Sequence, residues 1–157
     1  MSVKLKSLHL IVLSILFTMT LTACSESNTS SIQNSKGIFY KSKLGFSLAF
    51  PESWKGKYAI EEQEKKFTVI QKHNNKTAII FEIWTEAESK WKGLTPEEEA
   101  DRPVTKICIN NGLVFVYYIH DTQPPYMNVD DEEKKATKEF NEMSKDIKQI
   151  IGSFKII

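Results

Sequence analysis

Two positions in the second half of the chain carry side chains that could do covalent or acid–base chemistry. Cys108 has a thiol that a neighbouring histidine could activate as a nucleophile, and His120-Asp121 could act as an acid–base pair where a predicted strand meets a loop. The residues around Cys108 form an apolar strand pattern, which predicts a buried structural thiol. No serine stands at a fixed spacing from His120. We therefore predict no catalytic residue and no enzyme.

Metal-ligating residue types are present, but their spacing is wrong for a metal site. His73 and His120 are far apart in the sequence and form no ligand pair. The acidic runs 97–99 and 130–133 lack the alternation of a calcium loop, and acids in the first turn of a helix are explained by the helix dipole. The six glycines are scattered and form no phosphate loop. The sequence predicts no metal and no cofactor.

Large aromatic side chains lie near the ends of predicted strands. Trp and Tyr are favoured where binding energy concentrates. Trp54 and Trp84 are expected to cover the edges of the core. Trp91, which two lysines flank, and the Pro125-Tyr126 pair are the residues that we predict to form a contact surface for a partner.

The first 24 residues fall into three parts of different chemistry. Lys4 and Lys6 give a positive start, and residues 7–23 contain no Asp, Glu, Lys or Arg. This apolar run suits the hydrophobic region of a signal peptide, and it is short and interrupted by Ser and Thr for a membrane span of about 20 apolar residues. It ends in Leu21-Thr22-Ala23-Cys24, which resembles the lipobox of bacterial lipoproteins.

The lipobox resemblance implies that residues 1–23 are a signal peptide and that Cys24 is lipidated. Diacylglycerol and palmitate are the expected lipids, and two acyl chains anchor a protein stably where one would not. The membrane, reached through Cys24, is then one partner, and the location is the extracytoplasmic face of the cell membrane. The alternatives are an ordinary secretory signal with an incidental cysteine and an uncleaved anchor.

The composition of the remaining chain limits its function. Removing residues 1–23 takes away two lysines and no acid, which leaves 19 basic and 20 acidic residues. This balance provides no basic surface for nucleic acid. With Cys24 lipidated, Cys108 is the only remaining thiol, so no intramolecular disulfide is expected. The polar residues 24–36 are interpreted as the lipidated cysteine and a flexible tether, and residues 37–157 as one globular domain.

Alternating apolar residues predict most of the strands. Phe46 to Phe50 alternates and ends at Pro51, and segments 58–62 and 67–71 have similar patterns. In the segment 77–85, Ile79, Phe81 and Ile83 are predicted to share one face. Between the strands, Thr95-Pro96-Glu97-Glu98 has the capping-box pattern of a short middle helix.

A hairpin is predicted from residue 104 to residue 120. Asn111-Gly112 favours the two-residue turn that matches strand twist. Such a turn pairs Ile109 with Val114 and Ile107 with Val116 on one face, and Cys108 with Phe115 on the other. Because both faces are apolar, we expect the hairpin to lie centrally in a sheet that is covered on both sides.

The clearest helix comes last. Asp130 is the predicted N-cap, and Glu133 is the predicted capping-box residue that bonds back to it. An apolar stripe runs through Phe140, Met143 and Ile147, and the helix is predicted to end at Gly152. Residues 153–157 complete the pattern as a closing strand. The chain is therefore predicted to be α+β, with one antiparallel sheet of about six to seven strands, a short middle helix and a long C-terminal helix.

Two stretches resemble PsbP-like domains. Gly45-Phe46-Ser47 through Pro51-Glu52-Ser53-Trp54 is similar to their opening, and Ile150-Ile151-Gly152-Ser153-Phe154 is similar to their end. The resemblance implies an α-β-α sandwich that acts as a binding or assembly module, and no site residue carries over. Our leading hypothesis is accordingly a non-catalytic interaction or assembly domain with a protein partner at the cell surface. The alternative is a small-molecule-binding or hydrolytic domain that uses the His120–Tyr126 loop.

Overall fold

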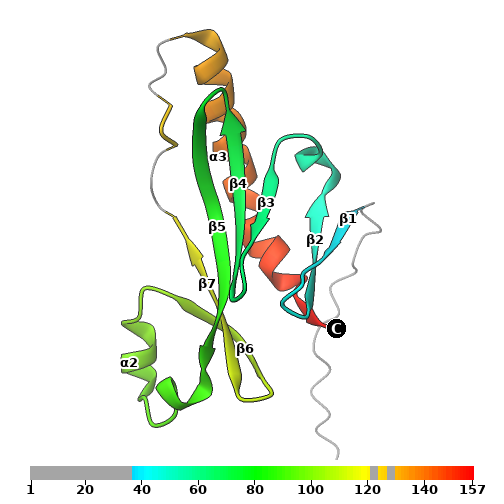
Figure 1. The fold of residues 1–157 in the computed structure, drawn as a ribbon. Helices are drawn as coiled ribbons and strands as arrows, with labels where there is room; N and C mark the ends of the chain where they lie inside the picture. The colour runs from blue at the N-terminus through cyan, green and yellow to red at the C-terminus, as the bar shows by residue number, and fades with distance from the viewer. Residues whose placement is uncertain (1–36, 121–123, 127–129) are drawn as a thin grey trace, which may run out of the picture. The chain divides into compact units, whose positions relative to one another are not determined.

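The structure is a computed structural model that describes residues 37–120, 124–126 and 130–157, all within one compact unit (Figure 1). The α+β class and the long C-terminal helix predicted from the sequence are confirmed. A three-stranded antiparallel sheet has the order β1-β2-β8, and a five-stranded antiparallel sheet has the order β3-β4-β5-β7-β6. The strands are β1 (Gly37–Lys41), β2 (Phe46–Pro51), β3 (Ala59–Glu62), β4 (Lys66–His73), β5 (Lys76–Ala87), β6 (Thr105–Asn110), β7 (Leu113–Ile119) and β8 (Lys155–Ile156).

One short helix, one long helix and two helical turns complete the described part of the chain. They are η1 (Glu52–Trp54), η2 (Glu88–Lys90), α2 (Pro96–Ala100) and α3 (Asp131–Gly152). None of the helices in the described ranges combines the length and the apolar character that crossing a membrane requires. The predicted signal peptide, Cys24 and the tether lie outside the described residues.

The prediction of a single sheet of six to seven strands is wrong, because the chain leaves the first sheet after β2. Pro51 ends that strand, and the turn η1 with Gly56 at a φ of 76° redirects the backbone before β3 begins. Later, β8 returns to pair with β2, where Phe46 lies opposite Ile156. The strands are therefore divided between two sheets.

Two β-bulges change which side chains share a face. In β5, Val69 pairs with Phe81 while Ile70 pairs with Ile79, so Ile80 is the extra residue. Ile80 is fully buried beside Phe81, and Ile79 is only half-buried, which makes the predicted face of Ile79, Phe81 and Ile83 wrong at its first member.

The predicted hairpin is present, but its position in the sheet differs from the prediction. Asn111 and Gly112 have φ of 48° and 75°, and Ile109 pairs with Val114 as expected. A bulge between Lys106 and Cys108 leaves Ile107 without its predicted partner Val116, which pairs with Lys106 instead. Because β6 is the edge strand of the five-stranded sheet, the hairpin is not central.

Cys108 is half-buried rather than fully buried, because β6 is an edge strand. It lies on the edge strand β6, opposite Phe115, and packs against the main core. Burial raises the pKa of its thiol, so the thiolate is disfavoured at neutral pH. The structure gives this cysteine a packing role.

The helix α3 binds the two sheets into one core. Its buried stripe consists of Ala136, Phe140, Met143, Ile147 and Ile150. This stripe contacts β2 of the first sheet and β4 and β5 of the second. The side chains of Phe46, Leu48 and Phe50 on β2 alternate inward and are at most 1% exposed.

The predicted N-cap is present at both α-helices, and the reciprocal bond of a capping box is present at α2. The Thr95 hydroxyl accepts a hydrogen bond from the Glu98 backbone N–H at 3.2 Å, and the Glu98 carboxylate accepts one from the Thr95 N–H at 2.8 Å. At α3, Asp130 accepts from the Glu133 N–H at 2.7 Å, while the Glu133 carboxylate binds the Lys76 ammonium at 2.6 Å. The helix ends at Gly152, as predicted.

The buried stripe of α3 makes a stability prediction. Phe140 and Ile147 are 4% and 1% exposed, so Phe140→Ala or Ile147→Ala should reduce the free energy of unfolding by about 2–5 kcal/mol. Chemical denaturation followed by circular dichroism measures this change. Lys145→Ala, on the exposed side of the helix where the lysine pairs with Glu142, should cost less than about 0.5 kcal/mol. Equal stability of parent and Phe140→Ala would show that the helix does not close the core.

Candidate functional site

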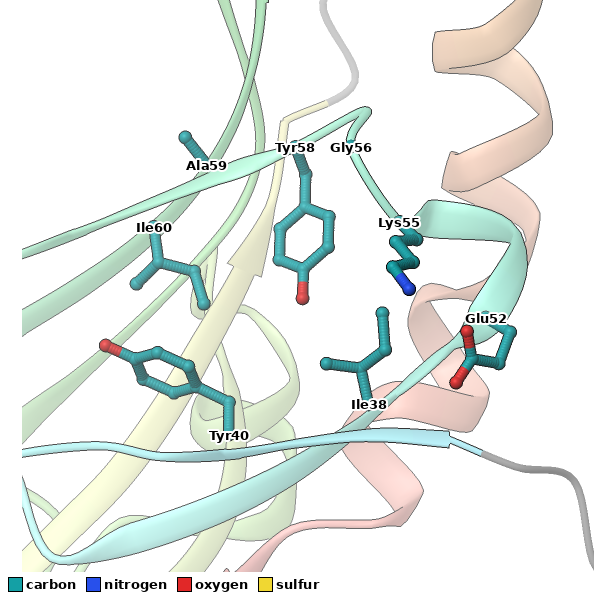
Figure 2. A pocket seen from close by; sticks show the side chains of 8 residues that line it. All are labelled: Ile38, Tyr40, Glu52, Lys55, Gly56, Tyr58, Ala59 and Ile60. Carbon is teal, nitrogen blue, oxygen red and sulfur yellow. The ribbon is translucent and has the colours of Figure 1, made fainter.

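A hollow of about 710 Å³ opens between β1 and the start of β3 (Figure 2). Strand alternation places Ile38 and Tyr40 on one side of β1, and Tyr58 and Ile60 on one side of the segment that leads into β3. Figure 2 shows these four side chains pointing toward one another from the two segments. We call this hollow the wedge. All four side chains are half-buried and pack against the main core.

Aromatic rings of the core support the walls of the wedge. The Tyr58 ring stacks on Phe50 at a centroid distance of 4.7 Å and meets the Trp54 ring edge-on at 5.6 Å. On the other side, the Tyr40 ring contacts Phe67 at 5.6 Å. Because Phe50, Trp54 and Phe67 are at most 1% exposed, the wedge is a continuation of the core toward solvent.

A carboxylate joins the two segments at one end of the wedge. Glu62, at the end of β3, accepts a hydrogen bond from the Lys43 backbone N–H in the β1–β2 turn at 3.2 Å. The Tyr40 hydroxyl also interacts with the Glu62 side chain. Burial, the nearby charge of Glu62 and this interaction together raise the pKa of Tyr40 above its ordinary value. Tyr40 therefore stays protonated and remains a hydrogen-bond donor.

The opposite end of the wedge is open and carries one acidic and one basic side chain. Glu52 and Lys55, both exposed, line it together with Gly56. A site of several hundred Å³ with an apolar interior and a few polar groups matches the general form of ligand sites. The wedge can therefore receive an apolar or aromatic group with a polar end.

A second hollow, of about 470 Å³, lies between η1 and α3 and is lined mainly by charged residues. Three of its charged side chains already have partners within the chain. The Trp54 indole N–H donates to Asp146 at 2.9 Å, and Lys145 pairs with Glu142 at 2.8 Å. These internal bonds make it a weaker candidate than the wedge.

A buried carboxylate that the sequence analysis did not single out lies beside His120. Glu82, on β5, is 7% exposed, and its oxygens bind the Lys66 ammonium at 2.6 Å, the Thr68 hydroxyl at 3.2 Å and His120 Nε2 at 3.1 Å. Burial by itself would raise the pKa of Glu82, but the hydrogen bonds from Lys66, His120 and Thr68 outweigh it and hold this pKa below its ordinary value. The alternation of β5 places Glu82 on the face opposite Phe81. This alternation was the only feature of the sequence that could have indicated the position of Glu82.

The lowered pKa of Glu82 links this cluster to stability. Because the folded-state pKa lies below the unfolded value of about 4.5, the stabilisation is present above that value and is lost as pH falls through the folded pKa. Glu82→Gln should therefore reduce the free energy of unfolding by about 1–3 kcal/mol at pH 7, and this difference should shrink below pH of about 4. Denaturant titrations at several pH values measure both effects.

Glu61→Gln is the matched control for this prediction. Glu61 pairs with Lys72 at 3.3 Å, but both side chains are more than half exposed, so its loss should cost less than about 0.5 kcal/mol. If Glu82→Gln behaves like Glu61→Gln at pH 7, the cluster does not stabilise the fold.

The structure places two of the three predicted contact residues in the interior. Trp91 is 5% exposed, its indole N–H donates to Glu86 at 2.9 Å, and the Arg102 guanidinium lies 4.2 Å above its ring. Tyr126 is also 5% exposed, and its hydroxyl donates to Gln71 at 3.1 Å. Only Pro125 is exposed. None of the three residues lines the wedge.

The other candidates also have structural surroundings. His73 ends β4, contacts the Tyr126 ring at 5.4 Å and lies 3.2 Å from the Asn74 amide. Trp54 covers the core as expected. Asp121 lies outside the described residues, so the predicted His120-Asp121 pair is not described. Among the described residues no three His, Cys, Asp or Glu side chains group as metal ligands would.

Comparison of the chain with protein-family models, with curated proteins and with solved structures finds no match.

Proposed function

We propose that this protein is a membrane-anchored extracytoplasmic lipoprotein whose folded unit is a non-catalytic binding or assembly module. The lipobox that ends in Cys24 supports the anchor. The wedge supports the binding role, and it is the observation that carries it. Its walls are core-like side chains that remain half-buried in a concave site, as in sites that are completed by a bound group.

The wedge best fits an aromatic or branched aliphatic side chain on an extended segment of a protein partner. β1 and β3 stand at the ends of their sheets, so each has one edge without a strand partner in the described part of the chain. An extended segment can pair with such an edge through its main chain while its side chains fill a neighbouring pocket. Glu52 and Lys55 at the open end can pair with polar groups of that segment.

The PsbP-like resemblance remains part of this proposal. Its two motif stretches are far apart in the sequence and adjacent in the fold, since Phe46 and Phe154 stack at a centroid distance of 4.8 Å. The first stretch contributes Glu52 to the wedge, and Lys55 and Gly56 follow it directly. This supports a shared binding or assembly role without supplying any site residue.

The alternative function is a small-molecule-binding or hydrolytic domain that uses the His120–Tyr126 loop. The contact between His120 Nε2 and Glu82 favours it, because a carboxylate can orient a histidine for acid–base work. Lys66 and Thr68 share the same carboxylate, which is the arrangement of a structural ion-pair cluster. The binding module therefore remains the better proposal.

The anchor is tested by changing the lipidated cysteine. Cys24→Ser should leave the precursor uncleaved and should abolish incorporation of labelled palmitate, because the thiol that accepts the lipid is gone. Gel mobility and lipid labelling of the full chain in a producing bacterium measure both effects. Cys108→Ser should retain processing and label. Normal processing of Cys24→Ser would contradict the anchor.

The binding role is tested by a photo-crosslinking residue placed at the open end of the wedge. Inserted at Lys55 in the full lipoprotein, it should capture a discrete protein in cells. Ile38→Trp, which fills the wedge from β1, should lower this capture about tenfold or more, equivalent to about 1.4 kcal/mol of binding free energy. Mass spectrometry of the captured product identifies the contacted segment.

Lys90 provides the matched control, since it is also an exposed lysine at the end of a short helical turn and is not a wedge residue. A crosslinker at Lys90 should give no discrete product. Thermal unfolding of Ile38→Trp checks that the fold survives. Capture that is equal from both positions, or that persists when the wedge is filled, would rule out the wedge as the binding site.

A further inference from the structure

The outer face of the three-stranded sheet carries the most exposed large apolar side chain of the described residues. On β2, Phe46, Leu48 and Phe50 point inward, so alternation turns Ser47 and Ala49 outward. Phe39 lies opposite Ala49 on β1 and is 79% exposed. The wedge residues Ile38 and Tyr40 point to the other side of the same strand. β1 therefore presents one side to the wedge and the other to solvent.

The same outer face is basic. Lys41 of β1 and Lys155 of β8 both lie opposite Ser47, so the three form one row across the sheet. Both lysines are exposed. The remaining positions that alternation assigns to this face, Gly37, Ala49 and Pro51, carry no charge, so the face has two positive charges, one exposed aromatic ring and no acid.

The position of this face along the chain relates it to the predicted anchor. β1 is the first described strand, and twelve residues, 25–36, separate its first residue from Cys24. Even fully extended, such a segment spans at most about 45 Å. The lipidated cysteine therefore keeps β1 within that distance of the lipid surface, and Phe39 is only two residues into the strand.

We propose that the outer face of the β1-β2-β8 sheet rests on the anionic surface of the membrane, with Phe39 in the interfacial layer and Lys41 and Lys155 against the lipid head groups. This inference rests on the proposed lipid anchor. An exposed aromatic ring beside lysines, with no acid on the face, is complementary to anionic lipid. The wedge opens on the other side of β1, so a docked sheet leaves it free for a partner.

The test uses the mature lipoprotein reconstituted in vesicles whose acyl chains carry bromine, which quenches tryptophan at short range. Phe39→Trp places a reporter on the outer face. Ile109→Trp is the matched control, because Ile109 is also an exposed apolar residue (50%) on an edge strand, β6. Quenching is measured relative to the parent, in vesicles of phosphatidylcholine alone and with one third phosphatidylglycerol.

With phosphatidylglycerol present, the tryptophan of Phe39→Trp should be quenched several-fold more than that of Ile109→Trp. Adding Lys41→Glu and Lys155→Glu should weaken docking by about fivefold or more for each lysine, and high salt should weaken it as well. Equal quenching of the two reporters in vesicles that carry the protein overturns this inference and leaves the anchor standing. If the protein does not float with the vesicles, the anchor is wrong and the inference falls with it.

Discussion

The fold depends on one contact, the burial of the apolar side of α3 against strands of both sheets. The helix touches β2 in the three-stranded sheet and β4 and β5 in the five-stranded sheet. No strand of one sheet pairs with a strand of the other. Phe50 and Phe81, whose rings lie 6.5 Å apart, meet where the two sheets share this core. Because the sheets separate on the side of β1 and β3, the aromatic side chains there stay half-buried and form the wedge. The candidate site therefore results from how the helix joins the two layers.

Local chemistry in the sequence predicts the elements well. The Thr95 capping box, the Asp130 cap and the Asn111-Gly112 turn each depend on a few adjacent residues, and each has the expected geometry. The α3 stripe is equally local, because a helix repeats its buried positions every three or four residues. The division into two sheets could not be predicted in this way. It depends on β8 pairing with β2 rather than with the five-stranded sheet, which is a choice between distant partners.

The site was harder to predict than the fold, for related reasons. The wedge combines side chains from β1 and from the segment before β3, and only the packing of two sheets brings them together. Trp91 was expected at the surface because lysines flank it, but Arg102 and Glu86 cover it from other parts of the chain. Glu82 lies within an apolar strand, where burial of a carboxylate becomes understandable only once Lys66 and His120 are placed beside it.

The pairing of β8 with the start of the fold has a consequence for how the protein is made. The Ala49 N–H donates to the Ser153 hydroxyl at 2.8 Å, and these residues are 104 positions apart. A ribosome delivers β2 early and delivers α3 and β8 last, so the inner face of β2 stays uncovered until nearly all of the described chain has been synthesised. Contacts of such long sequence separation slow folding, because the loop must close before they form. Such a delay is compatible with the export that the proposed lipoprotein signal requires, because an exported chain has to cross the membrane before it folds.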